Sequence, residues 1–208
     1  MSGASTAGLV VALVEDDAAV LDSLRLLLES QGLTVRAFGS TEDFLASLPE
    51  APPACVVSDV RLPGMSGIDL QRALKAQGRD LPVILITGHG DVAMAVAAMK
   101  EGAFDFVEKP YDAERLIAGI KQALAEGAEQ RYRDGQLTEL RERLAELSPR
   151  QREVMQLVAE GLSNKQIAHR LGISPRTVEN YRAWVMERMG AGNVAELVRK
   201  VLMIERGR

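Results

Sequence analysis

Short apolar runs alternate five times with amphipathic helical patterns in the first 125 residues, and this alternation constrains the fold most. The runs are rich in valine and isoleucine and are typical of strands buried on both faces: residues 9–14, 34–38, 54–58, 82–86 and 104–107. Helical apolar spacing covers residues 18–31, 41–48, 67–76, 92–101 and 112–125. The order (βα)5 predicts an α/β domain with a doubly wound parallel sheet, whose site lies outside the carboxyl ends of the strands.

Composition excludes several classes of protein. Of the 208 residues, 47% are apolar, and no apolar run is long enough to span a bilayer, so neither a disordered chain nor a membrane protein is expected. The N-terminus lacks the basic region and cleavage site of a secretory signal. The single cysteine, Cys55, cannot form an internal disulfide, and two distant histidines do not make a usual zinc site. These features predict a cytoplasmic protein.

Charge is distributed unevenly along the chain. Residues 1–124 carry a balance of −7, residues 125–147 carry −2, and residues 148–208 carry +5. This asymmetry favours an acidic regulatory or metal-binding module joined to a small module that binds a polyanion. Charge can also vary along a chain by chance.

Acidic and phosphate-binding side chains gather where the predicted strands end. They are Glu15, Asp16 and Asp17 after the first run, Asp59 after the third, Thr87 after the fourth and Lys109 after the fifth. No glycine-rich loop follows the first run, which argues against a dinucleotide or P-loop site. Carboxylates without cysteine or histidine favour Mg²⁺. A carboxylate beside such a cation can attack a phosphoryl group and form an aspartyl phosphate.

Residues 8–125 resemble the receiver domains of bacterial two-component response regulators. Asp59 follows Asp16 by 43 residues and precedes Thr87 by 28 and Lys109 by 50, all within the family's usual range. The resemblance implies that Asp59 is the phosphoacceptor, that Thr87 and Lys109 sense the phosphate, and that Phe106 is the aromatic switch. It also implies that Mg²⁺ is bound directly by Asp16, Asp59 and the carbonyl of Arg61, and through water by Glu15. Asp17 is expected to cap the first helix instead.

The remaining sequence is helical in pattern. Residues 126–147 are expected to form a helical linker whose leucines at 137, 140, 144 and 147 pack against a domain or form a dimer seam. Gly127 and Gly135 make that helix locally breakable. Helices are then predicted at residues 149–160, opened by Ser148 and Pro149, and at 164–171, 175–189 and 194–203. This arrangement describes a helix-turn-helix whose third helix reads the major groove.

Residues 148–204 resemble the all-α, four-helix DNA-binding domain of the LuxR type, through SPRQREVMQLVAEGLSNKQIAHRLGISPRTVENYR. The resemblance implies a core of Ile167, Ala168, Leu171, Val178 and Val185. It places Glu179, Asn180 and Ala183 toward base edges, and makes Lys165, Arg176, Thr177, Tyr181 and Arg182 candidates for phosphate contacts. Helical spacing turns Trp184 the other way, and we expect it to pack, whereas Arg188, Arg199 and Lys200 are typical of a solvated face.

Together the two halves resemble the NarL/FixJ class of transcription factors, with a receiver domain at 1–125, a linker at 126–147 and a DNA-binding domain at 148–208. The runs TGHGD at 87–91 and DFVEKP at 105–110 lean toward its FixJ branch. The resemblance implies a sensor histidine kinase of the FixL kind, double-stranded promoter DNA on a pseudo-palindromic site, RNA polymerase as a partner, dimerisation on phosphorylation, and no enzymatic turnover. The resemblance implies no membrane partner.

Two alternatives stay open at this stage. One is an Mg²⁺-dependent phosphatase or phosphotransferase with an aspartate nucleophile, a class that usually carries a second aspartate two residues after the nucleophile, where this chain has Arg61. The other is a receiver-shaped domain that is never phosphorylated and whose DNA binding is constitutive. The intact set of acids, Thr87 and Lys109 argues against the second.

Overall fold

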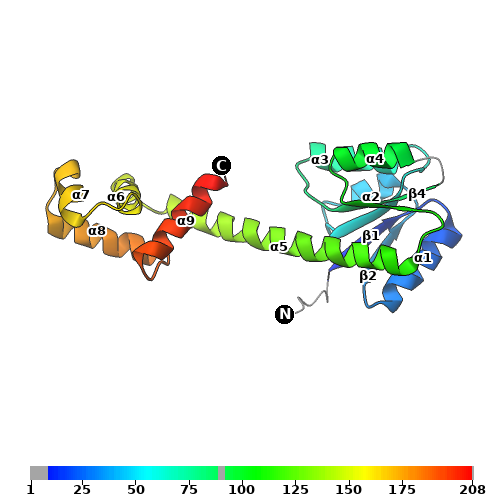
Figure 1. Cartoon of the computed structure of the whole chain (residues 1–208), viewed down its shortest axis with the longest axis horizontal. Coiled ribbons are helices and arrows are strands. Elements are labelled where there is room, and N and C mark those ends of the chain that lie inside the picture. The colour runs from blue at the N-terminus through cyan, green and yellow to red at the C-terminus, as the bar shows by residue number, and fades with distance from the viewer. Residues whose placement is uncertain (1–8, 89–91, 208) are drawn as a thin grey trace. The chain divides into compact units, whose positions relative to one another are not determined.

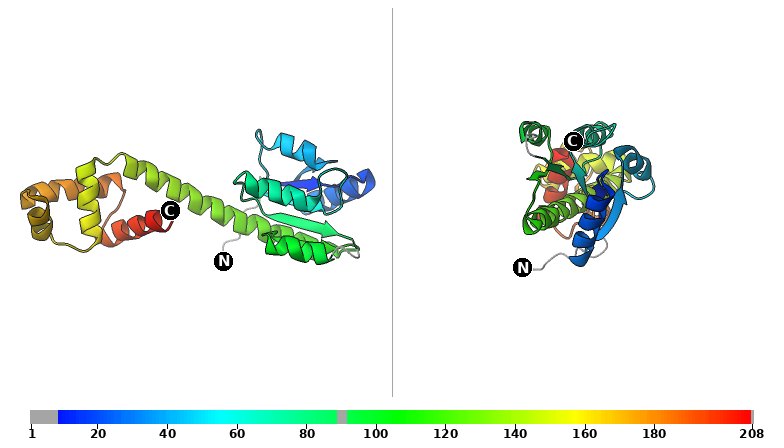
Figure 2. Two further views of the ribbon diagram at one scale, coloured as in Figure 1. Left: turned by 90° about the horizontal axis from the view of Figure 1, so that it is seen from above. Right: turned by 90° about the vertical axis from the view of Figure 1, so that its right-hand side faces the viewer.

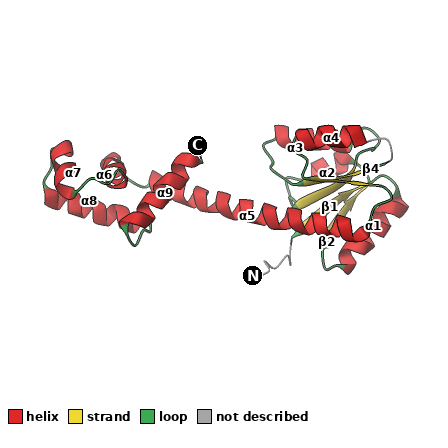
Figure 3. Ribbon diagram, in the orientation of Figure 1, coloured by secondary structure: helices red, strands yellow, loops and turns green. Residues whose placement is uncertain are grey.

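The computed structural model describes residues 9–88 and 92–207 (Figure 1). Of the run TGHGD, residues 89–91 therefore lie outside the described part of the chain. The chain divides into two compact units, Met1–Gln130 and Arg131–Arg208. All the strands, shown in yellow in Figure 3, belong to the first unit.

The first unit contains the predicted parallel sheet. Its strands are β1 (Val10–Val14), β2 (Thr34–Phe38), β3 (Cys55–Asp59), β4 (Val83–Thr87) and β5 (Asp105–Glu108), in the order β2-β1-β3-β4-β5. They alternate with α1 (Ala18–Ser30), α2 (Thr41–Ser47), α3 (Gly67–Ala76), α4 (Val92–Lys100) and α5 (Ala113–Ala145). The (βα)5 prediction is confirmed, with each strand within one residue of its predicted bounds.

Helices cover both faces of the sheet, which is why the central strands β1, β3 and β4 are buried along almost their whole length, whereas the edge strands β2 and β5 are more exposed and carry charged residues. Alternate strand residues such as Leu13 and Val57 pack with α1 and the start of α5, through Leu28 and Leu116. The intervening strand residues pack with α2, α3 and α4, through Phe44, Leu70, Leu74 and Ala98. Figures 1 and 2 show these two layers of helices on either side of the strands.

The register of the sheet brings the carboxyl ends of the strands to one edge. Asp59, the last residue of β3, pairs with Ile86, and Thr87, the last residue of β4, pairs with Glu108. Both functional side chains therefore lie in the last position of their strands, where we had expected them just beyond the strand ends. The site predicted outside the strand ends is therefore built on hydrogen-bonded strand residues.

The second unit is entirely helical in the part that the structure describes. It holds the end of α5 followed by α6 (Pro149–Ala159), α7 (Asn164–Leu171), α8 (Pro175–Arg188) and α9 (Val194–Arg206), each within three residues of prediction. Ser148 and Ser163 open α6 and α7 as capping boxes closed by Gln151 and Gln166. Gly172 ends α7 in the left-handed conformation, with φ of 64°, that glycine adopts without steric cost.

The core of this unit matches the prediction. Ile167, Ala168, Val178 and Val185 are buried, and Leu171 is partly buried against them. The linker leucines belong to the same core, because Leu140 and Leu147 are buried in it and Leu137 and Leu144 pack on it. Of the two alternatives for the leucine stripe, the structure therefore shows packing within the unit.

Residues 126–145 are helical, as predicted for the linker, but they continue the preceding helix instead of forming a separate one. Helix α5 runs without interruption for 33 residues, through the expected end at residue 125 and through Gly127 and Gly135. A glycine in a helix costs only about 1 kcal/mol relative to alanine, which is not enough to break a helix whose two ends are packed. Within the described residues, no helix combines the length and apolar character that crossing a bilayer requires.

Candidate functional site

Three side chains from three strand ends meet at the carboxyl edge of the sheet. The ammonium of Lys109, after β5, donates to Oδ2 of Asp59 and to Oε2 of Glu15, the latter at 2.9 Å. Glu15 and Asp59 are buried, with 3% and 8% of their surface exposed, whereas 30% of the Lys109 side chain is exposed. A buried pair of carboxylates thus shares one cation that reaches the surface.

Backbone groups hold Asp59 in place. The backbone N–H of Arg61 donates to Oδ1 of Asp59 at 2.7 Å, which leaves Oδ2 to Lys109. At the start of α3, a Cβ on Gly67 would collide with the carbonyl oxygen of Asp59. The loop after β3 can close over Asp59 only because residue 67 is glycine.

Electrostatics follow from this burial. Burial raises the pKa of Glu15 above its ordinary value, and its hydrogen bond and ion pair with Lys109 offset this only in part. Burial also lowers the pKa of Lys109, but its hydrogen bonds to Asp59 and Glu15 outweigh that effect and leave the pKa raised. Lys109 is therefore a firmly charged cation at this edge.

Thr87 and Phe106 lie on the neighbouring strands. Thr87 is fully buried, and its hydroxyl donates to the carbonyl of Gly88 at 3.4 Å. That contact is long and weak, so the hydroxyl can exchange it for a stronger acceptor. Phe106, on β5, is partly buried against the cluster under α2, α3 and α4. Both predicted switch residues thus border the face that carries α4.

The structure distinguishes the three acids after β1. Asp17 caps α1 as expected, accepting from the N–H groups of Ala19 and Val20 at 2.8 and 3.1 Å. Asp16 is exposed, and Glu15 turns inward to Lys109. Among the described residues, no three acids, histidines or cysteines come close enough to form a metal cluster.

This arrangement still fits Mg²⁺ in its chemistry. Mg²⁺ commonly takes one or two carboxylates and completes its shell with water, so it does not need a three-acid cluster. The donors here are all oxygens, from the carboxylates of Asp16 and Asp59 and the carbonyl of Arg61, with no competing thiolate or imidazole among them.

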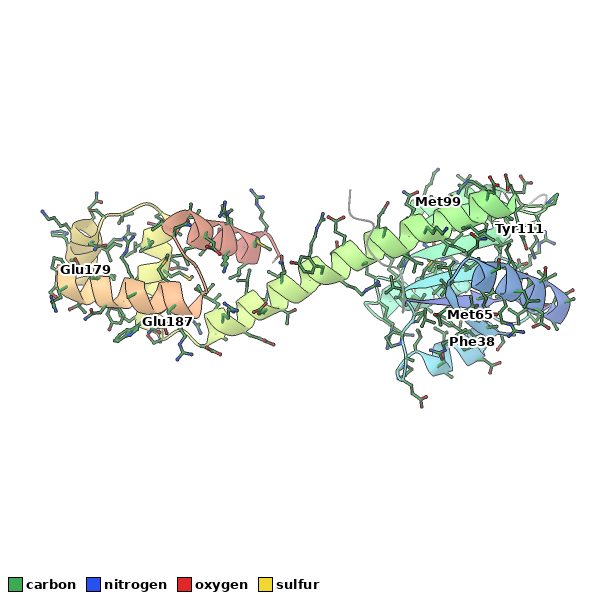
Figure 4. All side chains as sticks on the ribbon, turned by 90° about the horizontal axis from the view of Figure 1, so that it is seen from below. Phe38, Met65, Met99, Tyr111, Glu179 and Glu187 are labelled. Atoms are coloured by element: carbon green, nitrogen blue, oxygen red, sulfur yellow. The ribbon has the colours of Figure 1, made fainter. Side chains whose placement is uncertain are left out.

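A second candidate surface lies on α7 and α8. Glu179, Asn180 and Ala183 are all exposed on α8, on the side away from the buried Val178 and Val185. Figure 4 shows Glu179 and Glu187 along this helix. Arg176 and Lys165 are exposed near the starts of α8 and α7, while Thr177, Tyr181 and Arg182 are half-buried at the sides of α8. The structure therefore presents the predicted base-edge residues together on one surface.

One sequence-based expectation about α8 is wrong. Trp184 does not pack in the core; 51% of it is exposed, and its ring makes a T-shaped contact with the ring of Tyr181, with centroids 5.8 Å apart. Spacing places residue 184 beside the buried Val185 but on the flank of the helix. Whether that flank is covered depends on α5 and α6, which a helical pattern cannot reveal.

Sequence reasoning also missed several supporting contacts. It gave Glu15 a role only toward metal, whereas the structure pairs it with Lys109. It assigned Arg188 to a solvated face, where 62% of the side chain is indeed exposed, but it did not foresee the ion pair of Arg188 with Glu146 at 3.0 Å. A charge of opposite sign 42 residues away carries no local signal of such a pair.

Comparisons with known proteins give a family match for each of the two units. Residues 11–121 match the family described as "Response regulator receiver domain", and residues 145–201 match "Bacterial regulatory proteins, luxR family". The chain is 48% identical to the transcriptional regulatory protein FixJ of Azorhizobium caulinodans, over 94% of this chain and 92% of that one. It is 42% identical to the response regulator protein TodT of Pseudomonas putida, over 91% and 84%. The solved structure of the response regulator StyR is 40% identical with a TM-score of 0.85, covering 93% and 98%.

Proposed function

Because the chain belongs to the response regulators that join a receiver domain to a LuxR-type DNA-binding domain, and regulates transcription as they do, we propose that Asp59 is the residue through which phosphorylation controls it. The observation that carries this proposal is the contact of Lys109 with Asp59 at the end of β3, beside the buried hydroxyl of Thr87. The relatives named as transcriptional regulators support a switch rather than an enzyme that turns over substrate.

Each side chain has a distinct part in the transfer. A carboxylate oxygen of Asp59 attacks the phosphorus of a phosphohistidine or of a small acyl phosphate, and the bond from phosphorus to the donor atom breaks as the new P–O bond forms. Lys109 then pairs with a phosphoryl oxygen in place of the carboxylate it now contacts. Thr87 gives up its weak bond to Gly88 and donates to another phosphoryl oxygen.

Asp16, Asp59 and the carbonyl of Arg61 would hold Mg²⁺ directly, and Glu15 would act through water. When bound, Mg²⁺ would neutralise the negative charges of the carboxylates and of the incoming phosphoryl group. Without Mg²⁺, Lys109 offsets only one of the two charges of the buried Glu15 and Asp59, so the site still repels a phosphoryl group.

For DNA, Glu179, Asn180 and Ala183 face base edges, and Lys165, Arg176, Thr177, Tyr181 and Arg182 contact phosphates. The balance of +5 over residues 148–208 supports this assignment, because phosphate contacts dominate the affinity of such modules. Lys165 on α7 and Arg176 on α8 are exposed basic side chains, and Glu179 and Asn180 form an exposed polar face on α8. These features fit a helix that enters the major groove.

Further partners follow from the same function. A sensor histidine kinase, of the FixL kind in view of the FixJ relatives, supplies the phosphoryl group, and RNA polymerase receives the signal at the promoter. Dimerisation on phosphorylation is supported by α4, whose Met94, Val96 and Met99 are each more than a third exposed and would be covered by a second copy. A protein that binds promoter DNA acts where the chromosome is, in the cytoplasm.

The test is phosphoryl incorporation, measured by intact mass after incubation with acetyl phosphate and Mg²⁺. We expect one phosphoryl group per wild-type chain, none on Asp59→Asn and none after the metal is chelated. Asp80→Asn, which changes an exposed carboxylate before β4, is the matched control and should behave as wild type. Incorporation into Asp59→Asn at the wild-type rate, or sustained turnover of phosphate esters, would contradict the proposal.

A further inference from the structure

We infer that Trp184 and Arg188 form, with Thr177 and Tyr181, a stripe along one flank of α8 that holds the sugar–phosphate backbone of the bound DNA. This inference rests on the proposed DNA-binding function of α8 and extends its contact surface by two turns of helix. The occupant we assign to the stripe is one strand of the same duplex.

Spacing establishes the stripe. Residues 177, 181, 184 and 188 are separated by four, three and four positions, which places them in one row on a helix. The T-shaped contact between the rings of Tyr181 and Trp184 confirms that these two neighbours in the row touch. The row runs beside the exposed residues Asn180 and Glu187, so a ligand seated on that face is within reach of it.

Trp184 is unusual in its exposure. An indole left half exposed on a packed helix offers a large apolar surface and one N–H donor, a combination suited to resting on a deoxyribose while donating to a phosphate oxygen. The base-reading residues of a recognition helix lie toward its N-terminus. Trp184, in the last turns of α8, is placed where such a helix leaves the groove and meets the backbone.

A hollow of about 830 Å³ adjoins Trp184 and is lined by Arg143, Glu146, Gln151, Glu187 and Arg188. Its two arginines are engaged only by exposed glutamates: Arg188 with Glu146 at 3.0 Å and Arg143 with Glu139 at 2.6 Å. Exposed ion pairs contribute little to stability, so a phosphate can take the place of a carboxylate. Glu146 is then a competitor that DNA must displace from Arg188.

Charge favours DNA over a second copy of the chain as the occupant. The unit that carries the stripe has an excess of five positive charges, which repels an identical surface and attracts a polyanion. The stripe also adjoins the base-reading residue Asn180 on α8, so the same duplex can reach both surfaces.

Fluorescence tests the contact directly, because Trp184 is the only tryptophan of the chain. Full-length protein, phosphorylated with acetyl phosphate and Mg²⁺, is titrated at low salt with a labelled mixed-sequence duplex, so that anisotropy reports binding while indole emission reports Trp184. We expect emission to change with the same midpoint as the anisotropy, and bound DNA to protect the indole from acrylamide quenching.

Substitutions give the energetic test. Trp184→Ala should weaken binding about three- to tenfold for every sequence, the value of one lost hydrogen bond or apolar contact, and Trp184→Phe should fall between it and wild type.

Arg188→Ala should lower the slope of log affinity against log salt by about one. Glu146→Gln should strengthen binding more than Glu205→Gln, a matched loss of charge on α9. Tyr132→Ala, an exposed aromatic of α5, should leave affinity unchanged.

The outcomes separate this inference from the function on which it rests. Absence of binding in every protein would overturn the proposed DNA binding and the stripe with it. Normal binding with unchanged emission and an unaffected Trp184→Ala variant would overturn the stripe alone. Emission that changes with protein concentration in the absence of DNA would show that a second copy covers Trp184, and would also overturn it.

Discussion

At the residue scale, Lys109 is the side chain on which the two buried carboxylates of the site depend. It is the cation that two buried carboxylates share, and each would be left in a poorly hydrated place without it. A single side chain after β5 therefore links the stability of the sheet edge to the chemistry of Asp59. The sequence predicted Lys109 as a phosphate ligand, but its present partner Glu15 was expected to act only toward the metal.

Replacing Lys109 should make this dependence measurable. We expect Lys109→Met to lower the free energy of unfolding by roughly 1–3 kcal/mol, less than for a fully buried pair because the lysine is partly exposed, and to slow phosphorylation. Circular dichroism in urea measures the first effect. Adding Glu15→Gln should restore part of the loss, and Lys121→Met, on the exposed side of α5, should have no effect. An undiminished stability in Lys109→Met would refute the shared-cation account.

Glu196 provides a test by pH in the second unit. Its carboxylate accepts from the N–H of Gly192 at 2.9 Å, and this hydrogen bond, followed by the nearby Lys200, lowers the pKa of Glu196 below its ordinary 4.5. A lowered folded-state pKa stabilises the fold above pH 4.5, and the contribution is lost as pH falls through the lowered value.

Urea unfolding followed by Trp184 emission reports on this unit. Wild type should lose stability with acid more steeply than Glu196→Gln, whose amide does not titrate. Parallel acid profiles for the two proteins would show that the hydrogen bond to Gly192 does not couple to folding.

At the scale of elements, the apolar pattern of the sequence predicts which strands and helices form better than it predicts where a helix ends or which neighbours cover it. Each strand and helix of the first unit follows from its apolar period, because burial on two faces or on one leaves a direct trace in sequence. The continuity of α5 did not, since Gly127 and Gly135 are typical of a break and only packing at both ends overrides them. The exposure of Trp184 likewise depends on which helices cover the flank of α8.

The leucines of α5 carry a prediction at this scale. Leu140 is buried among α6, α8 and α9 residues, so Leu140→Ala should destabilise the second unit by about 2–4 kcal/mol, measured by Trp184 emission in urea. Leu202→Ala, on the exposed side of α9, should change stability by less than about 0.5 kcal/mol. If Leu140→Ala instead kept full stability and lost only self-association, the leucines would form a seam between chains.

At the scale of the whole molecule, a charge change in the first unit has to alter DNA binding by the second unit. On the proposed function, phosphorylation would add about −1.5 to −2 at Asp59 and draw Lys109 and Thr87 toward the phosphate. Thr87 would then vacate space for Phe106 and reshape the face of α4 and β5, where Met94, Val96 and Met99 are exposed. Two copies joined at that face would bring two +5 units to one pseudo-palindromic site.

Phosphorylation could act in a second way, by releasing the basic DNA-binding unit from shielding by the acidic receiver unit. Sedimentation distinguishes this release from dimerisation, because only dimerisation changes the mass of the particle. The −7 and +5 balances of residues 1–124 and 148–208 favour such shielding, but charge alone does not distinguish the two. We expect phosphorylated protein to sediment as a dimer. A phosphorylated monomer whose DNA affinity equals that of the isolated second unit, residues 131–208, would establish release instead.

The affinity of the full chain for promoter DNA, with and without acetyl phosphate, tests the central claim most directly. It is measured by anisotropy for wild type and Asp59→Asn at one salt concentration, because phosphate contacts make affinity depend on salt. Phosphorylation should raise the affinity of wild type and leave Asp59→Asn unchanged. Equal gains in the two proteins, or phosphorylated wild type with no gain, would contradict control of DNA binding through Asp59.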